Sequence, residues 1–142
     1  MSEQILWNGI LAVIGVGIGF LLSQLTDLMK NSRRKGVIKK ALINELSIIR
    51  KTLSDGLERE NRISNQQFPL ITDTYDSVRI ELASFIKPDS LAVVQRTYQE
   101  IRKMNSEAGG HIVIAGSLDH IYQFTDFNKV ITLIDDSVTR LK

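Results

Sequence analysis

The chain has 142 residues, a formal net charge of +2 and no cysteine. This length allows one modest domain and an appendage, and the missing cysteines exclude disulfides, zinc–thiolate sites and thiol nucleophiles. The apolar content of 43% is that of an ordinary soluble protein, but the apolar residues are unevenly distributed along the chain.

An uncharged segment occupies residues 5–25. Of its 21 positions, 14 are apolar and four are glycine. A helix of this length measures about 32 Å, enough to cross a hydrocarbon core of about 30 Å. A secretory signal peptide would need a basic start and a small-residue cleavage site, and the sequence has neither. We therefore expect an uncleaved transmembrane anchor over residues 1–29, with an unusually hydrophobic core helix as the alternative.

A basic collar over residues 30–40 follows this segment. Its six basic residues, without any acidic residue, are Lys30, Arg33, Arg34, Lys35, Lys39 and Lys40. Lys and Arg near a membrane span are enriched on the cytoplasmic side, so the collar predicts an N-terminus outside and a cytoplasmic domain over 41–142. The collar also suits anionic lipid headgroups of the bilayer. Residues 41–142 contain 12 basic and 14 acidic residues, a balance that does not favour nucleic-acid binding.

Small and polar residues gather on one face of the expected membrane helix. They are Asn8, Ala12, Gly15, Gly19 and Ser23, spaced by 4, 3, 4 and 4 residues. Such a stripe, which includes a GxxxG pair, lets two helices approach closely in lipid. It predicts self-association of the span and a homo-oligomer. The alternative is that glycine is simply common in membrane helices.

Apolar residues from residue 38 onward recur at the spacing of amphipathic helices. A long helix is expected over about 33–63, and shorter helices are expected to start near residues 72, 90 and 128. The apolar positions that carry this pattern are Ile38, Leu42, Leu46, Ile49, Leu53, Leu57, Tyr75, Val78, Leu82, Phe85, Leu91, Val94, Tyr98, Ile101, Val130, Ile134, Val138 and Leu141. The predicted fold class is all-α: one transmembrane helix followed by a cytoplasmic bundle of a long helix and three or four shorter ones.

One segment, residues 111–116, is ambiguous between strand, loop and helix. It contains a β-branched run bracketed by glycines, and periodicity cannot separate a short strand from a buried helical turn. A strand would need a partner that is not evident in this chain and would have to pair between subunits. We therefore expect a loop or a helix start here, and a helical turn or two over residues 118–124.

Residues suited to catalysis are sparse. His111 and His120 are the only histidines, and neither lies in a metal-binding motif. The acidic residues around Asp119 and Asp126 are more simply interpreted as a solvated face than as a metal site. We therefore expect no catalytic residue, no cofactor and no metal, and hence a non-enzymatic protein.

The plan of the chain resembles the small single-pass membrane proteins of unknown function found in bacteria and their prophages. An anchor, a basic collar and a long helix precede short helices such as those containing LITDTY at 70–75 and YQEIRKMN at 98–105. The resemblance implies a location in the bacterial inner membrane and transfers no functional residue.

The leading functional hypothesis is a self-associating membrane protein whose cytoplasmic domain senses or binds a cytoplasmic protein or a small-molecule signal. Its concrete form is a membrane-disrupting effector in phage defence or exclusion, acting through the membrane helix. One alternative is a passive anchor or scaffold that recruits a cytoplasmic protein. Another is a holin-like phage lysis protein.

Overall fold

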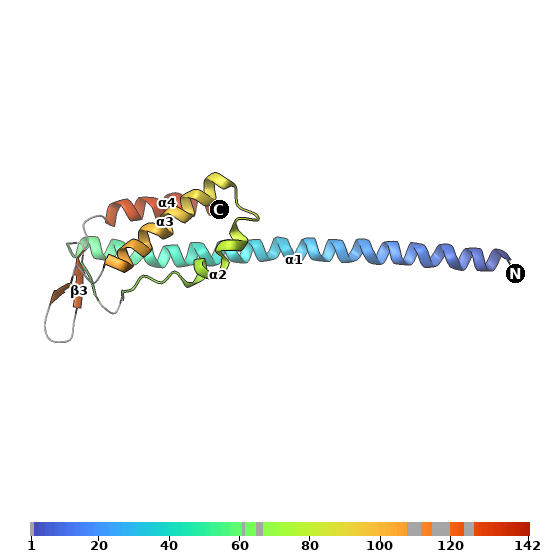
Figure 1. Ribbon diagram of the computed structural model, residues 1–142, viewed down its shortest axis with the longest axis horizontal. Helices are drawn as coiled ribbons and strands as arrows, with labels where there is room; N and C mark the ends of the chain where they lie inside the picture. The colour runs from blue at the N-terminus through green and yellow to red at the C-terminus, as the bar shows by residue number, and fades with distance from the viewer. Residues whose placement is uncertain (1, 61, 65–66, 108–111, 115–119, 124–126) are drawn as a thin grey trace. The chain divides into compact units, whose positions relative to one another are not determined.

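The computed structural model describes the backbone of residues 2–60, 62–64, 67–107, 112–114, 120–123 and 127–142. It describes the side chains of residues 18–60, 62–64, 67–107 and 127–142. The chain divides into two units, Met1–Val37 and Ile38–Lys142. The elements follow in the order α1, β1, α2, α3, β2, β3 and α4 (Figure 1).

The helical part of the predicted fold class is confirmed. The described residues form one long helix, α1 (Ser2–Glu58), and three shorter ones, α2 (Asp73–Leu82), α3 (Pro88–Glu107) and α4 (Phe127–Leu141). The membrane-spanning part of the prediction is not supported by the structure. No helix in the part of the chain that the structure describes has an apolar stretch long enough to cross a membrane. The side chains at positions 5–17 of the expected span lie outside the described set.

The core of the second unit forms where the apolar spacing placed it. On α1, Leu42, Leu46 and Leu53 are fully buried, and Ile38 and Ile49 are nearly so. The other helices contribute the buried residues Tyr75, Leu82, Val94, Tyr98, Ile101, Val130, Ile134 and Leu141. Val78, Phe85, Leu91 and Val138 pack against this core while remaining partly exposed. The 3.6-residue period therefore predicted the inward face of each helix correctly.

Two polar residues allow α3 and α4 to pack closely against each other. The hydroxyls of Thr97 on α3 and Ser137 on α4 lie 2.8 Å apart, and both residues are fully buried. Thr97 Oγ1 also lies 3.1 Å from the carbonyl oxygen of Leu133 on α4. Short side chains at this crossing bring the two backbones together, and the mutual hydrogen bond satisfies both hydroxyls.

The expectation for residues 111–124 is wrong where the structure describes them. Instead of a loop and helical turns, β2 (Ile112–Ile114) and β3 (His120–Gln123) form an antiparallel pair. β3 also pairs with β1 (Arg62–Ser64), so the sheet order is β1-β3-β2. The β-branched run of β2 suits an extended chain, and its partner lies in the same chain rather than in another subunit. Residues 111, 115–119 and 124 lie outside the described set.

The C-terminal end of α1 is shaped by a close contact at Gly56. A Cβ atom built there would lie 2.7 Å from Phe127 Cε2 and 3.2 Å from the carbonyl oxygen of Arg62. Only a residue without a side chain lets the start of α4 and the start of β1 approach this closely. The chain then leaves the helix through Glu60, whose φ of 58° lies in the left-handed region. α1 therefore ends at Glu58, earlier than the predicted residue 63.

Candidate functional site

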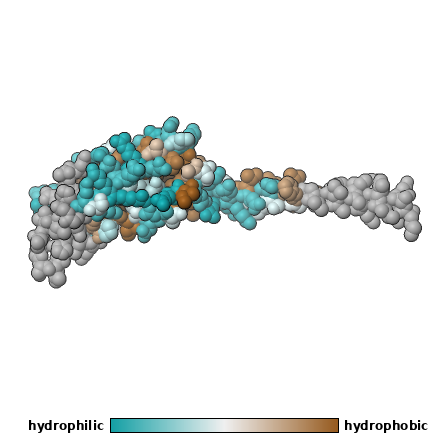
Figure 2. Space-filling model, in the orientation of Figure 1, coloured by the Kyte–Doolittle hydropathy of each residue, from teal (hydrophilic) through white to brown (hydrophobic). Residues whose placement is uncertain are grey.

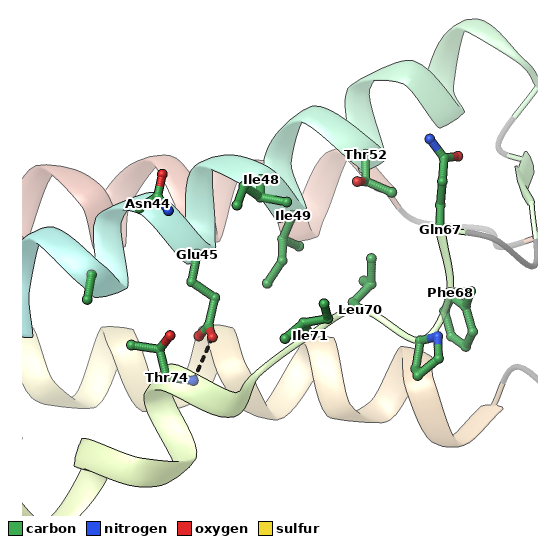
Figure 3. A pocket seen from close by; sticks show the side chains of 12 residues that line it. Asn44, Glu45, Ile48, Ile49, Thr52, Gln67, Phe68, Leu70, Ile71 and Thr74 are labelled. Carbon is green, nitrogen blue, oxygen red and sulfur yellow. Dashed lines mark hydrogen bonds between the residues drawn. The ribbon is translucent and has the colours of Figure 1, made fainter.

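A groove opens on the second unit between α1 and the segment 67–74 that leads into α2 (Figure 3). Its volume is about 610 Å³, within the usual range for ligand sites of about 300–1,000 Å³. It is lined by Ala41, Asn44, Glu45, Ile48, Ile49, Thr52, Gln67, Phe68, Pro69, Leu70, Ile71 and Thr74. Most of the lining surface is apolar. Two of the lining isoleucines are well exposed, Ile48 at 58% and Ile71 at 63%.

The buried carboxylate of Glu45 lies at one end of the groove. Glu45 is only 7% exposed, and its side chain extends from α1 toward Thr74 in Figure 3. Glu45 Oε2 accepts a 2.7 Å hydrogen bond from the backbone N–H of Thr74. Its Oε1 accepts hydrogen bonds from the N–H of Tyr75 at 3.3 Å and from the hydroxyl of Tyr98 at 2.8 Å. These donors come from α2 and α3, so a single carboxylate ties three helices together.

Glu45 acts as the N-terminal cap of α2. The first N–H groups of a helix lack intrahelical partners, and an acceptor must be supplied from elsewhere. Thr72 precedes α2 but makes no side-chain capping bond, and its hydroxyl donates to Asp76 Oδ2 instead. The carboxylate of Glu45 takes that role from α1, where its negative charge also faces the positive end of the α2 dipole.

Glu45 is not among the residues predicted from the sequence, although its position carries a usable signal. Glu45 stands three residues after Leu42 and four before Ile49, both core residues, so it shares their helical face. A glutamate on the apolar stripe of a helix needs buried hydrogen-bond partners. Those partners come from α2 and α3, which lie far along the chain, so their identity could not be read from this local pattern.

Two stacked tyrosines continue the network away from the groove. The rings of Tyr75 and Tyr98 lie 3.9 Å apart between centroids, with planes at 7°. The guanidinium of Arg102 lies 5.5 Å from the centroid of the Tyr75 ring and forms an ion pair with Asp76. Burial raises the pKa of both tyrosine hydroxyls, and for Tyr98 the hydrogen bond to Glu45 raises that pKa further. Both hydroxyls therefore stay protonated at neutral pH.

The segment opposite α1 is held from behind by Asn105 on α3. The carboxamide oxygen of Asn105 accepts the backbone N–H of Leu70 at 3.0 Å, and its nitrogen donates to the backbone oxygen of Leu70 at 2.8 Å. The Leu70 side chain is buried in the core. These two hydrogen bonds hold the second wall of the groove at Leu70, a residue that belongs to no helix or strand.

The groove offers binding groups rather than a reactive constellation. Its lining provides apolar surface, two carboxamides and two threonine hydroxyls, and its one carboxylate is occupied by three donors. Within the described part of the chain, no group of three His, Cys, Asp or Glu side chains could hold a metal ion. Comparisons of the chain with protein-family models, curated protein sequences and solved structures gave no match.

The residues predicted for membrane association lie in or next to the first unit. The side chains of Asn8, Ala12 and Gly15 are outside the described set, whereas Gly19 and Ser23 are exposed. In the basic collar, Lys30, Arg33, Arg34 and Lys40 are exposed, and Lys35 and Lys39 are half-buried. Large apolar side chains are exposed on the described part of α1 before the collar (Figure 2), namely Ile18, Phe20, Leu21, Leu22, Leu25, Leu28 and Met29.

Proposed function

We propose that this protein is a non-enzymatic, membrane-anchored binding protein whose helical domain captures a partner in the groove between α1 and residues 67–74. The observation that carries the proposal is the groove itself. Two of its lining isoleucines, Ile48 and Ile71, are solvent-exposed, whereas most large apolar side chains of the domain are buried in its core. Exposed apolar surface beside a hollow is typical of an interaction site.

Anchoring through residues 5–25 is supported by the sequence and by exposure. The segment carries no charge. The apolar side chains described at its C-terminal end and just after it, from Ile18 to Met29, are exposed rather than packed into a core. Such a surface is stable in lipid, and the basic collar that follows favours the cytoplasmic side of a bacterial inner membrane. The N-terminus would then lie outside and the helical domain inside.

Self-association through the small-residue stripe is the step that couples binding to the membrane. Among the described residues, no atom lies within 4 Å of a Cβ placed at Gly19, so this position is open to a second helix. A partner captured in the groove would change how the spans pack against one another. In a phage-defence or exclusion system, such repacking would make the membrane leaky.

A span exchange separates this function from a passive anchor. Residues 5–25 are replaced by a Leu–Ala helix of equal length and orientation, and a second variant carries Gly15→Ile with Gly19→Ile. Oligomer size by cross-linking and dye entry into expressing cells are measured under phage challenge. We expect both variants to lose oligomers and dye entry. If both keep the wild-type response, the span is only an anchor and the effector function is wrong.

A further inference from the structure

In the wall of the groove formed by residues 69–74, one residue, Ile71, has main-chain groups without a partner among the described residues. Figure 3 shows the chain drawn out between Pro69 and Thr74. The backbone N–H and C=O of Leu70 both bond to Asn105 on α3. Ile71 is the next residue along the same segment. No hydrogen bond to the main chain of Ile71 occurs within the described residues.

The lining also holds side chains that match peptide groups. The carboxamides of Asn44 and Gln67 stand on the two sides of the groove, and Gln67 extends toward α1 in Figure 3. Among the described residues, neither carboxamide has a hydrogen-bond partner in the protein. A carboxamide donates and accepts at once, as a peptide group does. Asn105 already shows this pairing within the chain, on the other side of the same segment.

The charges of the lining select against a charged occupant. Glu45 is the only ionisable residue in the lining, and its two oxygens already accept three hydrogen bonds. A charged side chain placed among Ile48, Phe68 and Ile71 would lose water and gain no counter-charge. The groove therefore suits uncharged residues.

The length of the groove sets the size of the occupant. Along α1 the lining extends from Ala41 to Thr52. At 1.5 Å per residue this stretch is about 16 Å long, which matches about five residues of an extended chain at about 3.3 Å each.

We infer that the groove binds an extended, uncharged segment of about five residues from a partner protein. Its main chain pairs with that of Ile71 and with the carboxamides of Asn44 and Gln67, and its apolar side chains contact Ile48 and Phe68. The pairing at Ile71 resembles a single step of strand addition, in which the main chain gives affinity and the pockets give specificity. The inference rests on the proposed function in one respect, because it names the partner of the same groove.

The test uses the full chain in lipid nanodiscs with labelled isoleucine methyl groups. Ile48 and Ile71 report on the groove, and Ile80, which is 84% exposed on α2 and outside the lining, is the internal control. Four probes are titrated separately. The first is an uncharged library of end-capped five-residue peptides built from Val, Ile, Thr, Ser and Gln. The second is the same library with Asp or Lys at the central positions, and the third is the uncharged library with N-methylated backbone amides. The fourth probe is octanoate.

We expect the uncharged library to shift the signals of Ile48 and Ile71 and to leave Ile80 unchanged. The charged and the N-methylated libraries should bind at least tenfold more weakly, because one lacks a counter-charge and the other lacks backbone donors. Ile71→Asp should abolish the shift of Ile48, whereas the matched Ile80→Asp should not. Both isoleucines are exposed, so both variants should fold as the wild type does by circular dichroism.

Three results would overturn the inference: equal binding of the N-methylated library, a groove response to octanoate alone, or no response to any library. These outcomes are separable from failure of the proposed function. If the libraries bind but the span exchange changes nothing in cells, the effector function is wrong and the peptide groove stands. If groove variants abolish the cellular response while no peptide binds, the groove serves a partner of another class.

Discussion

Tyr98 on α3 donates a 2.8 Å hydrogen bond to the carboxylate of Glu45 on α1. Because the same carboxylate caps α2 through the amides of Thr74 and Tyr75, the position of the second wall of the groove depends on Glu45 as well as on Asn105. The groove and the stability of the helical domain are therefore linked through Glu45.

Glu45→Ala should be among the most damaging single changes in the domain. It leaves a buried hydroxyl and two helix N–H groups without an acceptor, which costs about 3–5 kcal/mol of the free energy of unfolding. Glu45→Gln keeps part of the network and should cost about 1–3 kcal/mol. Urea unfolding followed by the near-ultraviolet circular dichroism of tyrosine measures both. Glu58→Ala, at an exposed glutamate of the same helix, is the control, and equal losses at the two positions would contradict the cap.

Gly56→Ala should destabilise the chain by about 1–3 kcal/mol, because the new methyl group would overlap Phe127, whose Cε2 lies 2.7 Å away. Phe127→Leu in the same chain should recover part of that loss, which a double-mutant cycle measures. Gly36→Ala is the matched control on the same helix. Within the described residues no atom lies within 4 Å of its Cβ, so this change should stabilise the helix by about 0.5–1 kcal/mol. Equal effects of the two alanines would show that the Phe127 contact is unimportant.

The stacked tyrosines predict a loss of stability in alkaline solution. The pKa values of Tyr75 and Tyr98 are raised by burial in the folded state, while an unfolded tyrosine ionises near pH 10. Above about pH 10 the unfolded chain releases protons that the folded chain keeps, so the free energy of unfolding falls as the pH rises. Below that pH the contribution is complete.

Tyr98→Phe isolates one of these two groups. Urea unfolding at pH 9, 10 and 11 should give a decline that is shallower for the variant, by up to about 1.4 kcal/mol per pH unit. Parallel curves for the two proteins would show that Tyr98 ionises as freely in the fold as in the unfolded chain.

The proposed topology can be tested with single cysteines, because the chain has none of its own. Ser2→Cys should react with a membrane-impermeant maleimide on intact cells. Asn128→Cys, at an exposed position of α4, should react only after the cells are permeabilised. Labelling of Asn128→Cys in intact cells would reverse the predicted orientation, and labelling of both would argue against a single span.

The helices were predictable because the local spacing of apolar residues indicates which face of each helix is buried. Leu42, Leu46 and Ile49 are examples, since a repeat of three or four residues has meaning only on a helix. The sheet was not predictable, because strands of three or four residues are too short to show alternation. The pairing of Ile63 with Tyr122 joins segments that the sequence does not relate. Glu45 and the groove were missed for a similar reason: a buried carboxylate is explained by its partners, and these become neighbours only after folding.

The central place of β3 in the sheet has a consequence for the order in which the protein matures. β1 follows directly on α1 but pairs with β3, and the ring of Phe127 that covers Gly56 comes later still. Phe127 can therefore cover the end of α1 only after almost the whole chain has left the ribosome. Residues 5–25 emerge long before that. In the proposed membrane-anchored protein, residues 5–25 would therefore reach the membrane before Phe127 covers the end of α1 and before β1 pairs with β3.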